Sequence, residues 1–206
     1  MDKKRTLFLK IFKKAEKKYG GYKKRLAGES WKENWQTLIA TIMSAQSRDE
    51  MTIPIAEELF RKYSTLQRLA DATYTDVLQI LKSMNYNRTK AKNIILCAKM
   101  LIDKYKGRVP DKIEQLIELP GVGRKTANLI ITACHNKDGI CVDTHVHRIS
   151  NILGIVKSRN PTETEFELMR VAPRKYWSKI NRIFVLWGKE VGGRDRKKLL
   201  AKLFKN

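Results

Sequence analysis

Residues 119–148 of this 206-residue chain read LPGVGRKTANLIITACHNKDGICVDTHVHR and contain the most informative motifs of the sequence. A Pro-Gly-Val-Gly turn, residues 120–123, joins two apolar segments with helical spacing. Proline cannot donate the hydrogen bond that would continue the first helix. Gly121 and Gly123 can adopt positive φ angles and leave the amides of the turn unobstructed. The sequence therefore predicts a tight hairpin between two helices, the second of which begins at about Arg124.

This hairpin is suited to bind a phosphate. The N–H groups at a helix N-terminus, joined to bare glycine amides, attract anionic oxygens. Such contacts position a nucleic acid without reading its sequence. The net charge of +22, from 43 basic and 21 acidic residues, favours a polyanionic partner. An ordinary helix–helix connection and a generally lysine-rich surface are the alternative interpretations.

Two residues near the turn are candidates for chemistry. Lys125 lies in the first turn of the second helix, where the helix dipole disfavours a protonated amine and so favours a nucleophile. Asp143 precedes an apolar-periodic helix and suits an N-cap, a position that also stabilises its ionised form. A carboxylate there would stabilise positive charge on a nearby sugar carbon. A surface lysine beside a phosphate and a cap alone remain the alternatives.

The chain around this stretch shows helical spacing and no convincing strand, so we expect an all-α protein. Thr75 is the expected cap of the helix that follows it, and residues 85–88 are expected to form a polar turn. We expect two lobes: residues 22–135, with the helical hairpin at about 111–134, and residues 1–21 together with 136–206. The expected helices are 6–19, 35–44, 49–63, 75–84, 89–105, 111–118, 124–134, 162–171, 174–188 and 194–204.

Composition bounds the remaining classes of function. The three cysteines, Cys97, Cys134 and Cys141, form no CxxC pair, which favours a reducing compartment and predicts no metal site. No apolar run approaches the roughly 18 residues of a membrane span. The apolar segment near the N-terminus is too short for a signal peptide. We expect an intracellular protein of the cytoplasm or nucleoid, without a membrane partner.

Several motifs of this chain resemble those of a known protein family. LPGVGRKTA followed by VDTHVHR resembles the endonuclease III family of the helix-hairpin-helix, Gly/Pro-Asp superfamily of DNA base-excision glycosylases. LIATIMSAQSRD resembles the LLSAQ-type segment of that family, and YNRTKAKNI resembles its lesion-side loop, so the resemblance covers nearly the whole chain. It implies an all-α, two-lobed glycosylase fold with DNA in the cleft between the lobes and a flipped base in a pocket.

The resemblance also implies a function. Lys125 matches the lysine that attacks C1′ of the damaged nucleoside, after which β-elimination nicks the strand, and Asp143 matches the aspartate that assists base loss. The implied enzyme is a bifunctional DNA glycosylase and abasic-site lyase for oxidised or ring-saturated pyrimidines. Its partner is double-stranded DNA with damaged bases or abasic sites, and we expect a monomer. The alternatives are a glycosylase for mismatched uracil or thymine or for 8-oxoguanine, and a non-catalytic DNA-binding module.

Further positions are assigned by the same resemblance. Gln46 matches the glutamine that fills the gap left by the flipped base, with an ordinary polar residue at a helix end as an equal alternative. Tyr86 falls at the position of the wedge. Asn85 replaces the usual glycine of that turn. His145 matches a histidine close to the substrate pocket, with packing or capping as an equal alternative, and Arg148 is expected to pack or pair. The expected DNA contacts are Gly121, Val122, Gly123, Arg124, Thr126, Gln46, Tyr86, Asn87 and Arg88.

The chain departs from the family in one respect. Most endonuclease III relatives carry four cysteines that hold a [4Fe–4S] cluster, but no cysteine follows Cys141 here, and Gly192 stands where the first ligand would be. Because such clusters need thiolates, we expect no cluster. The segment RDRKKLLAKLF, from residue 194, is expected to form a basic helix instead. The resemblance also implies that the hairpin can hold a monovalent cation, which is the one candidate ion for this chain.

Overall fold

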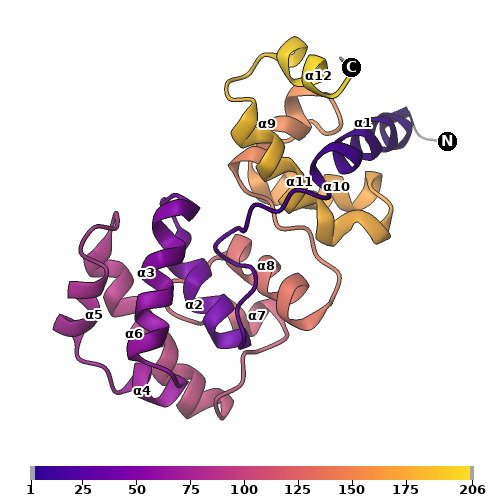
Figure 1. Ribbon diagram of the computed structural model, residues 1–206. Coiled ribbons are helices and arrows are strands. Elements are labelled where there is room, and N and C mark those ends of the chain that lie inside the picture. Colours follow the sequence, from indigo (N-terminus) through magenta and orange to yellow (C-terminus); the bar gives the residue numbers. More distant parts are fainter. Residues whose placement is uncertain (1–2, 205–206) are drawn as a thin grey trace. The chain divides into compact units, whose positions relative to one another are not determined.

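The computed structural model describes residues 3–204, and its regular elements over that range are all helices (Figure 1). The all-α prediction is confirmed. The elements are α1 (Lys3–Tyr19), α2 (Asn34–Ser44), α3 (Asp49–Lys62), α4 (Leu66–Ala70), α5 (Tyr74–Ile80), α6 (Asn87–Tyr105), α7 (Ile113–Leu116), α8 (Arg124–His135), α9 (Thr144–Ile152), α10 (Pro161–Val171), η1 (Arg174–Tyr176), α11 (Trp177–Glu190) and α12 (Arg196–Phe204).

The chain divides into two compact units. Residues 24–137 form one unit, and the residues before and after this range form the other. The sequence placed the boundaries at residues 22 and 135, and the existence of two separate domains stays a prediction. Lys125 belongs to the first of these units and Asp143 to the second.

In the unit of residues 24–137, α2 is the central helix. It contacts α3, α6 and α8, and its side chains Leu38, Ile39 and Met43 are fully buried. A capping box starts it, because Glu33 and Gln36 hydrogen-bond each other's backbone N–H groups. α2 ends at Ser44, so the turn into α3 lies at the end of the most buried helix of this unit.

In the other unit, α11 is central and contacts α1 and α9. Trp187 and Phe184 of α11 are fully buried, and Phe12 of α1 packs beside Phe184 with ring centroids 6.2 Å apart. α12 packs on α1 and buries Leu199 and Leu203. The predicted basic helix is therefore present from Arg196, and the structure shows in addition that one of its sides is apolar.

Two predicted boundaries are wrong for local reasons. Thr73, not Thr75, caps α5, because its Oγ1 accepts a hydrogen bond from the N–H of Asp76 at 3.2 Å. Asn87 and Arg88 do not continue the predicted polar turn but begin α6. Tyr86 adopts a left-handed conformation, φ 56°, which turns the chain sharply enough for the helix to start at the next residue.

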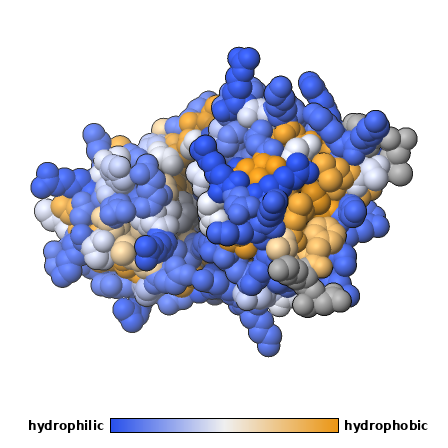
Figure 2. Space-filling view, turned by 90° about the horizontal axis from the view of Figure 1, so that it is seen from above, coloured by the Kyte–Doolittle hydropathy of each residue, from blue (hydrophilic) through white to orange (hydrophobic). Residues whose placement is uncertain are grey.

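Hydrophilic side chains cover most of the face in Figure 2, with an apolar area among them. Beside α1 and α12 lies a hollow of about 390 Å³ whose lining includes Leu7, Ile11, Leu200 and Phe204. None of the helices within residues 3–204 is long and apolar enough to cross a membrane.

Candidate active site and DNA-binding surface

The Pro-Gly-Val-Gly turn is a compact hairpin with one indispensable glycine. The N–H of Val122 donates to the carbonyl of Leu119 at 3.0 Å, which closes the turn. Gly121 has φ +81°, a conformation that favours glycine. A Cβ on it would lie 3.0 Å from Cγ2 of Ile42 and 3.1 Å from Cβ of Asn93. The hairpin therefore lies directly against α2 and α6.

Gly123 serves the hairpin in another way. Its φ of −98° and ψ of 176° are extended backbone, so the prediction that it can use positive φ is not realised. Gly123 is the N-cap of α8, and its carbonyl accepts the N–H of Ala127 at 2.9 Å. Because glycine has no side chain, no side-chain cap occupies the start of α8. A helix N-terminus without a side-chain cap is the kind of site at which anions bind.

The predicted DNA contacts around the hairpin differ in exposure. Val122 is buried in the core, and its N–H is already used within the turn. Gly121, Gly123 and Lys125 are exposed, and Arg124 and Thr126 are half-buried. Lys125 is thus presented at the surface in the first turn of α8. The contact of these residues with DNA stays a prediction.

Two further turns of the same unit are tied together. Gln46, between α2 and α3, and Tyr86, before α6, both have left-handed backbones and exposed side chains. Nδ2 of Asn85 donates to the carbonyl of Gln46 at 3.1 Å. Asn87 bonds the carbonyl of Lys82 at 2.9 Å, and Arg88 is exposed. The structure brings together the two residues that the sequence assigned to gap filling and wedging.

Lys90 lies beside these turns and was missed at the sequence level. Its side chain is 5% exposed, and Nζ donates to Oγ of Ser47 at 2.8 Å. Burial lowers the pKa of Lys90 to about 8. A signal existed in the sequence, because Lys90 falls four residues before Ile94 on the apolar side of a helix.

Asp143 is the N-cap of α9, as predicted. Its Oδ1 accepts a hydrogen bond from the N–H of Val146 at 2.8 Å, and its side chain is half-buried. Val146 and Ile149 bury the inner side of the helix. The cap thereby fixes the carboxylate in one place.

Arg148 of α9 packs and pairs, as expected. Its guanidinium donates to the carbonyls of Gly188 at 3.2 Å and Val191 at 3.1 Å, and also to that of Gly193. Burial lowers the pKa of Arg148, and the charge of Asp143 acts in the opposite direction. Arg148 thus connects the helix of Asp143 to the segment between α11 and α12.

His145 lies against the backbone of α11. A Cβ on Gly188 would lie 2.3 Å from Nδ1 of His145, so glycine is required there. Nη2 of Arg148 lies 3.5 Å from the same nitrogen. These contacts support the packing alternative for His145, and its place near a substrate pocket stays a prediction.

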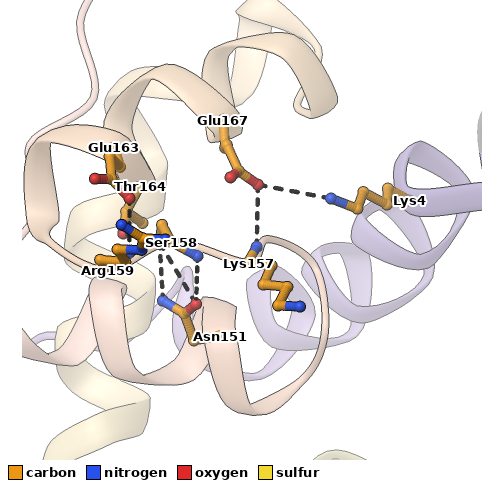
Figure 3. A network of polar contacts seen from close by, with 8 residues as sticks. All are labelled: Lys4, Asn151, Lys157, Ser158, Arg159, Glu163, Thr164 and Glu167. Atoms are coloured by element: carbon orange, nitrogen blue, oxygen red, sulfur yellow. Dashed lines mark hydrogen bonds and ion pairs between the residues drawn. The ribbon is translucent and has the colours of Figure 1, made fainter.

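A polar network holds the connection between α9 and α10 (Figure 3). Oδ1 of Asn151 accepts the N–H of Ser158 at 2.9 Å, and Nδ2 of Asn151 donates to Oγ of Ser158 at 3.0 Å. Oγ of Ser158 lies 2.6 Å from Oγ1 of Thr164, which lies 2.6 Å from Nδ1 of His147. In the same connection, the carboxylate of Glu167 in α10 accepts a hydrogen bond from the N–H of Lys157 at 3.0 Å. α9 is therefore fixed by polar contacts at both ends.

Comparison with known proteins identifies the family. A family model described as HhH-GPD superfamily base excision DNA repair protein matches residues 39–174, more than half of the chain. The chain belongs to this superfamily. The endonuclease III of Thermotoga maritima is 44% identical over 157 residues, which cover 76% of this chain and 74% of that relative. The endonuclease III of Bacillus subtilis is 36% identical over 75% of this chain and 71% of its own length.

Solved structures agree with this HhH-GPD assignment. A trapped covalent intermediate of endonuclease III with DNA has a TM-score of 0.84 and 32% identity, covering 92% of this chain and 88% of that one. A thermostable thymine-DNA glycosylase, with a TM-score of 0.80 but 17% identity, shares the fold alone. This HhH-GPD protein is a base excision DNA glycosylase and abasic-site lyase of the endonuclease III type.

The cysteines of this HhH-GPD protein do not fit an iron–sulfur cluster. Burial raises the pKa of Cys97 to about 12, and burial likewise raises that of Cys134 to about 11, so neither thiol ionises readily. Cys141 is buried in the other unit, and no cysteine follows it. Among residues 3–204 there is no group of three or more His, Cys, Asp or Glu side chains placed to hold a metal ion.

Proposed function

We propose that Lys125 is the nucleophile of this glycosylase and that its substrates are oxidised or ring-saturated pyrimidines in duplex DNA. The observation that carries the proposal is the glycine-capped start of α8, which presents Lys125 at the surface beside a hairpin suited to a phosphate. The 44% identity to an endonuclease III supports the substrate class.

The proposed chemistry begins at Nζ of Lys125. Nζ of Lys125 forms a bond to C1′ while the bond from C1′ to the base breaks, and the base leaves with a proton. Opening of the sugar ring gives a Schiff base between the lysine and C1′. Loss of a proton from C2′ then expels the 3′-phosphate by β-elimination, and water releases the lysine. A DNA phosphate bound at the hairpin would keep the DNA backbone in place during these steps.

Asp143 takes the electrostatic role in this proposal. Positive charge develops on the sugar as the base leaves, and an ionised carboxylate stabilises it. The hydrogen bond from the N–H of Val146 keeps this carboxylate in a fixed orientation. The same group therefore caps α9 and supports the charge, so the two interpretations of Asp143 are compatible.

We also propose that the enzyme works without a [4Fe–4S] cluster, in the intracellular compartment where DNA resides. The unsuitable cysteines support this, and α12 supplies apolar packing after the segment that would hold the first ligand. Iron analysis and visible absorbance of anaerobically purified protein test it. Stoichiometric iron with cluster absorbance would contradict it. A monovalent cation at the hairpin stays a prediction.

Borohydride trapping on a duplex with an abasic site tests the nucleophile. Lys125→Ala should abolish the trapped adduct while DNA affinity falls by less than about tenfold, because a single phosphate contact contributes little of the total. Lys99→Ala, which removes an exposed lysine of α6 in the same unit, should trap like the wild type. A Lys125→Ala protein that still traps fully would show that another amine attacks.

A panel of duplexes tests the substrate. Base release and strand nicking should be measured separately on duplexes with oxidised or ring-saturated pyrimidines, mismatched uracil or thymine, and 8-oxoguanine. The proposal expects release of the saturated pyrimidines to be fastest, with nicking at a comparable rate. Faster release of mismatched uracil or of 8-oxoguanine would assign the enzyme to another substrate class on the same fold.

A further inference from the structure

Lys90 is a buried amine that the proposed reaction leaves unused. Within the described residues no carboxylate pairs with it, and its hydrogen-bond acceptor is the neutral hydroxyl of Ser47. Burial of an ammonium group without a counter-charge disfavours folding. An uncharged side chain of similar length would fill the same space more favourably, so the charge of Lys90 calls for an explanation other than stability.

The position of Lys90 explains its charge, because Lys90 links the two turns that bear Gln46 and Tyr86. The backbone N–H of Lys90 donates to the carbonyl of Tyr86 at 2.9 Å. Its side chain reaches the other turn and donates to Ser47, the neighbour of Gln46. One residue therefore contacts one turn through its main chain and the other through its side chain.

The turn at Gln46 needs such support. Gln46 has φ 53°, which is disfavoured for a residue with a Cβ and persists only where the surroundings hold it. Asn85 bonds the carbonyl of Gln46, and Lys90 bonds the side chain of the next residue, Ser47. A charge-assisted hydrogen bond is stronger than a neutral one, so the ammonium holds the turn better than an amide or hydroxyl would.

We propose that Lys90 is a positioning residue: by holding Ser47, its ammonium fixes Gln46 relative to Tyr86, so that both side chains enter the duplex as one rigid probe. The inference rests on the proposed function and on the roles that the family resemblance implies for two residues, Gln46 as the gap filler and Tyr86 as the wedge. Lys90 itself contacts neither the sugar nor the base. Its contribution lies in preorganisation, because a probe that is already in place loses no freedom when DNA binds.

The test separates duplex distortion from chemistry. The reporter is a duplex that carries 2-aminopurine opposite a tetrahydrofuran abasic analogue. The fluorescence of 2-aminopurine rises when this base is unstacked. Lys90→Met should reduce this rise at saturating protein and should slow base release from a damaged duplex by roughly 10- to 100-fold, the loss expected for a charge-assisted hydrogen bond. Nicking of a single-stranded oligonucleotide with an abasic site should stay within about twofold, because a single strand has no gap to fill.

Three variants complete the design. Lys92→Met removes an exposed charge of the same helix and should change neither reaction. Ser47→Ala removes the acceptor and should slow the duplex reaction, whereas Lys90→Met with Ser47→Ala should be no slower than Lys90→Met alone, because both remove the same contact. Lys90→Arg should restore part of the duplex rate.

Several outcomes would overturn the inference. Equal losses on single-stranded and duplex substrates would indicate a general loss of folded enzyme, and an unchanged duplex rate would show that Lys90 positions nothing. Additive effects of the Lys90 and Ser47 variants would exclude the shared contact. If the wild type released none of the bases in the panel, the substrate proposal would fail, but the fluorescence of the abasic duplex would still test Lys90.

Discussion

The hairpin before Lys125 and the helix after Asp143 are held by different kinds of interaction. The hairpin depends on a buried valine and on one left-handed glycine, Gly121, where an added Cβ would crowd Ile42 and Asn93. α9 buries Val146 and Ile149, and hydrogen bonds hold it in addition at both ends, from Asp143 at its start and Asn151 at its last turn. The position of Lys125 should therefore be sensitive to side-chain volume added in the hairpin. The position of Asp143 should be sensitive to the loss of polar atoms in α9.

The largest effect expected from this difference is on catalysis by Asp143. Asp143→Asn keeps an oxygen that can accept the N–H of Val146, so the free energy of unfolding should change by less than about 0.5 kcal/mol. The charge is lost, and base release should fall by about 10²- to 10³-fold, as when one preorganised electrostatic group is removed. Single-turnover base release and urea unfolding measure the two quantities.

Asp143→Ala is the matched control for this change. It removes both the charge and the cap, so it should lose the same activity and about 1 kcal/mol of stability in addition. If Asp143→Asn destabilises the protein as much as Asp143→Ala, the cap is not what fixes the carboxylate. A normal rate of base release in Asp143→Asn would exclude the electrostatic role.

Volume added to the hairpin gives the next effect. Gly121→Ala combines a disfavoured φ with close contacts to Ile42 and Asn93, so it should lower the free energy of unfolding by roughly 2–4 kcal/mol. Gly123→Ala places a Cβ where no atom lies within 4 Å, on an extended backbone, and should change it by less than about 1 kcal/mol. Urea unfolding compares the two, and equal losses would contradict the asymmetry of the hairpin.

Features that depend on neighbouring residues in the chain could be predicted from the sequence. The start of α8 at Arg124 and the cap at Asp143 were predicted correctly, because a glycine turn and a capping aspartate act over three or four residues. The helical class followed from apolar spacing for the same reason.

Features that depend on packing could not be predicted in this way. Both glycines of the hairpin look equivalent in the sequence, and only the proximity of α2 and α6 to Gly121 distinguishes them. Lys90 was assigned no role, because its partner Ser47 lies far from it in the chain. The choice of Thr73 over Thr75 as a cap depends on where the preceding chain enters α5, which two threonines of equal propensity, two positions apart, do not specify.

The smallest effect should come from the far end of α9. Asn151→Ala removes the acceptor of the Ser158 N–H and the donors to the carbonyl of His147 and to Oγ of Ser158. Because these groups are half-buried and partly reached by water, the free energy of unfolding should fall by about 1–2 kcal/mol. Lys157→Ala, which removes an exposed side chain from the same connection, should change it by less than about 0.5 kcal/mol. If the polar contacts added nothing to the apolar packing of α9, Asn151→Ala would match this control, and the contrast between the two regions would not hold.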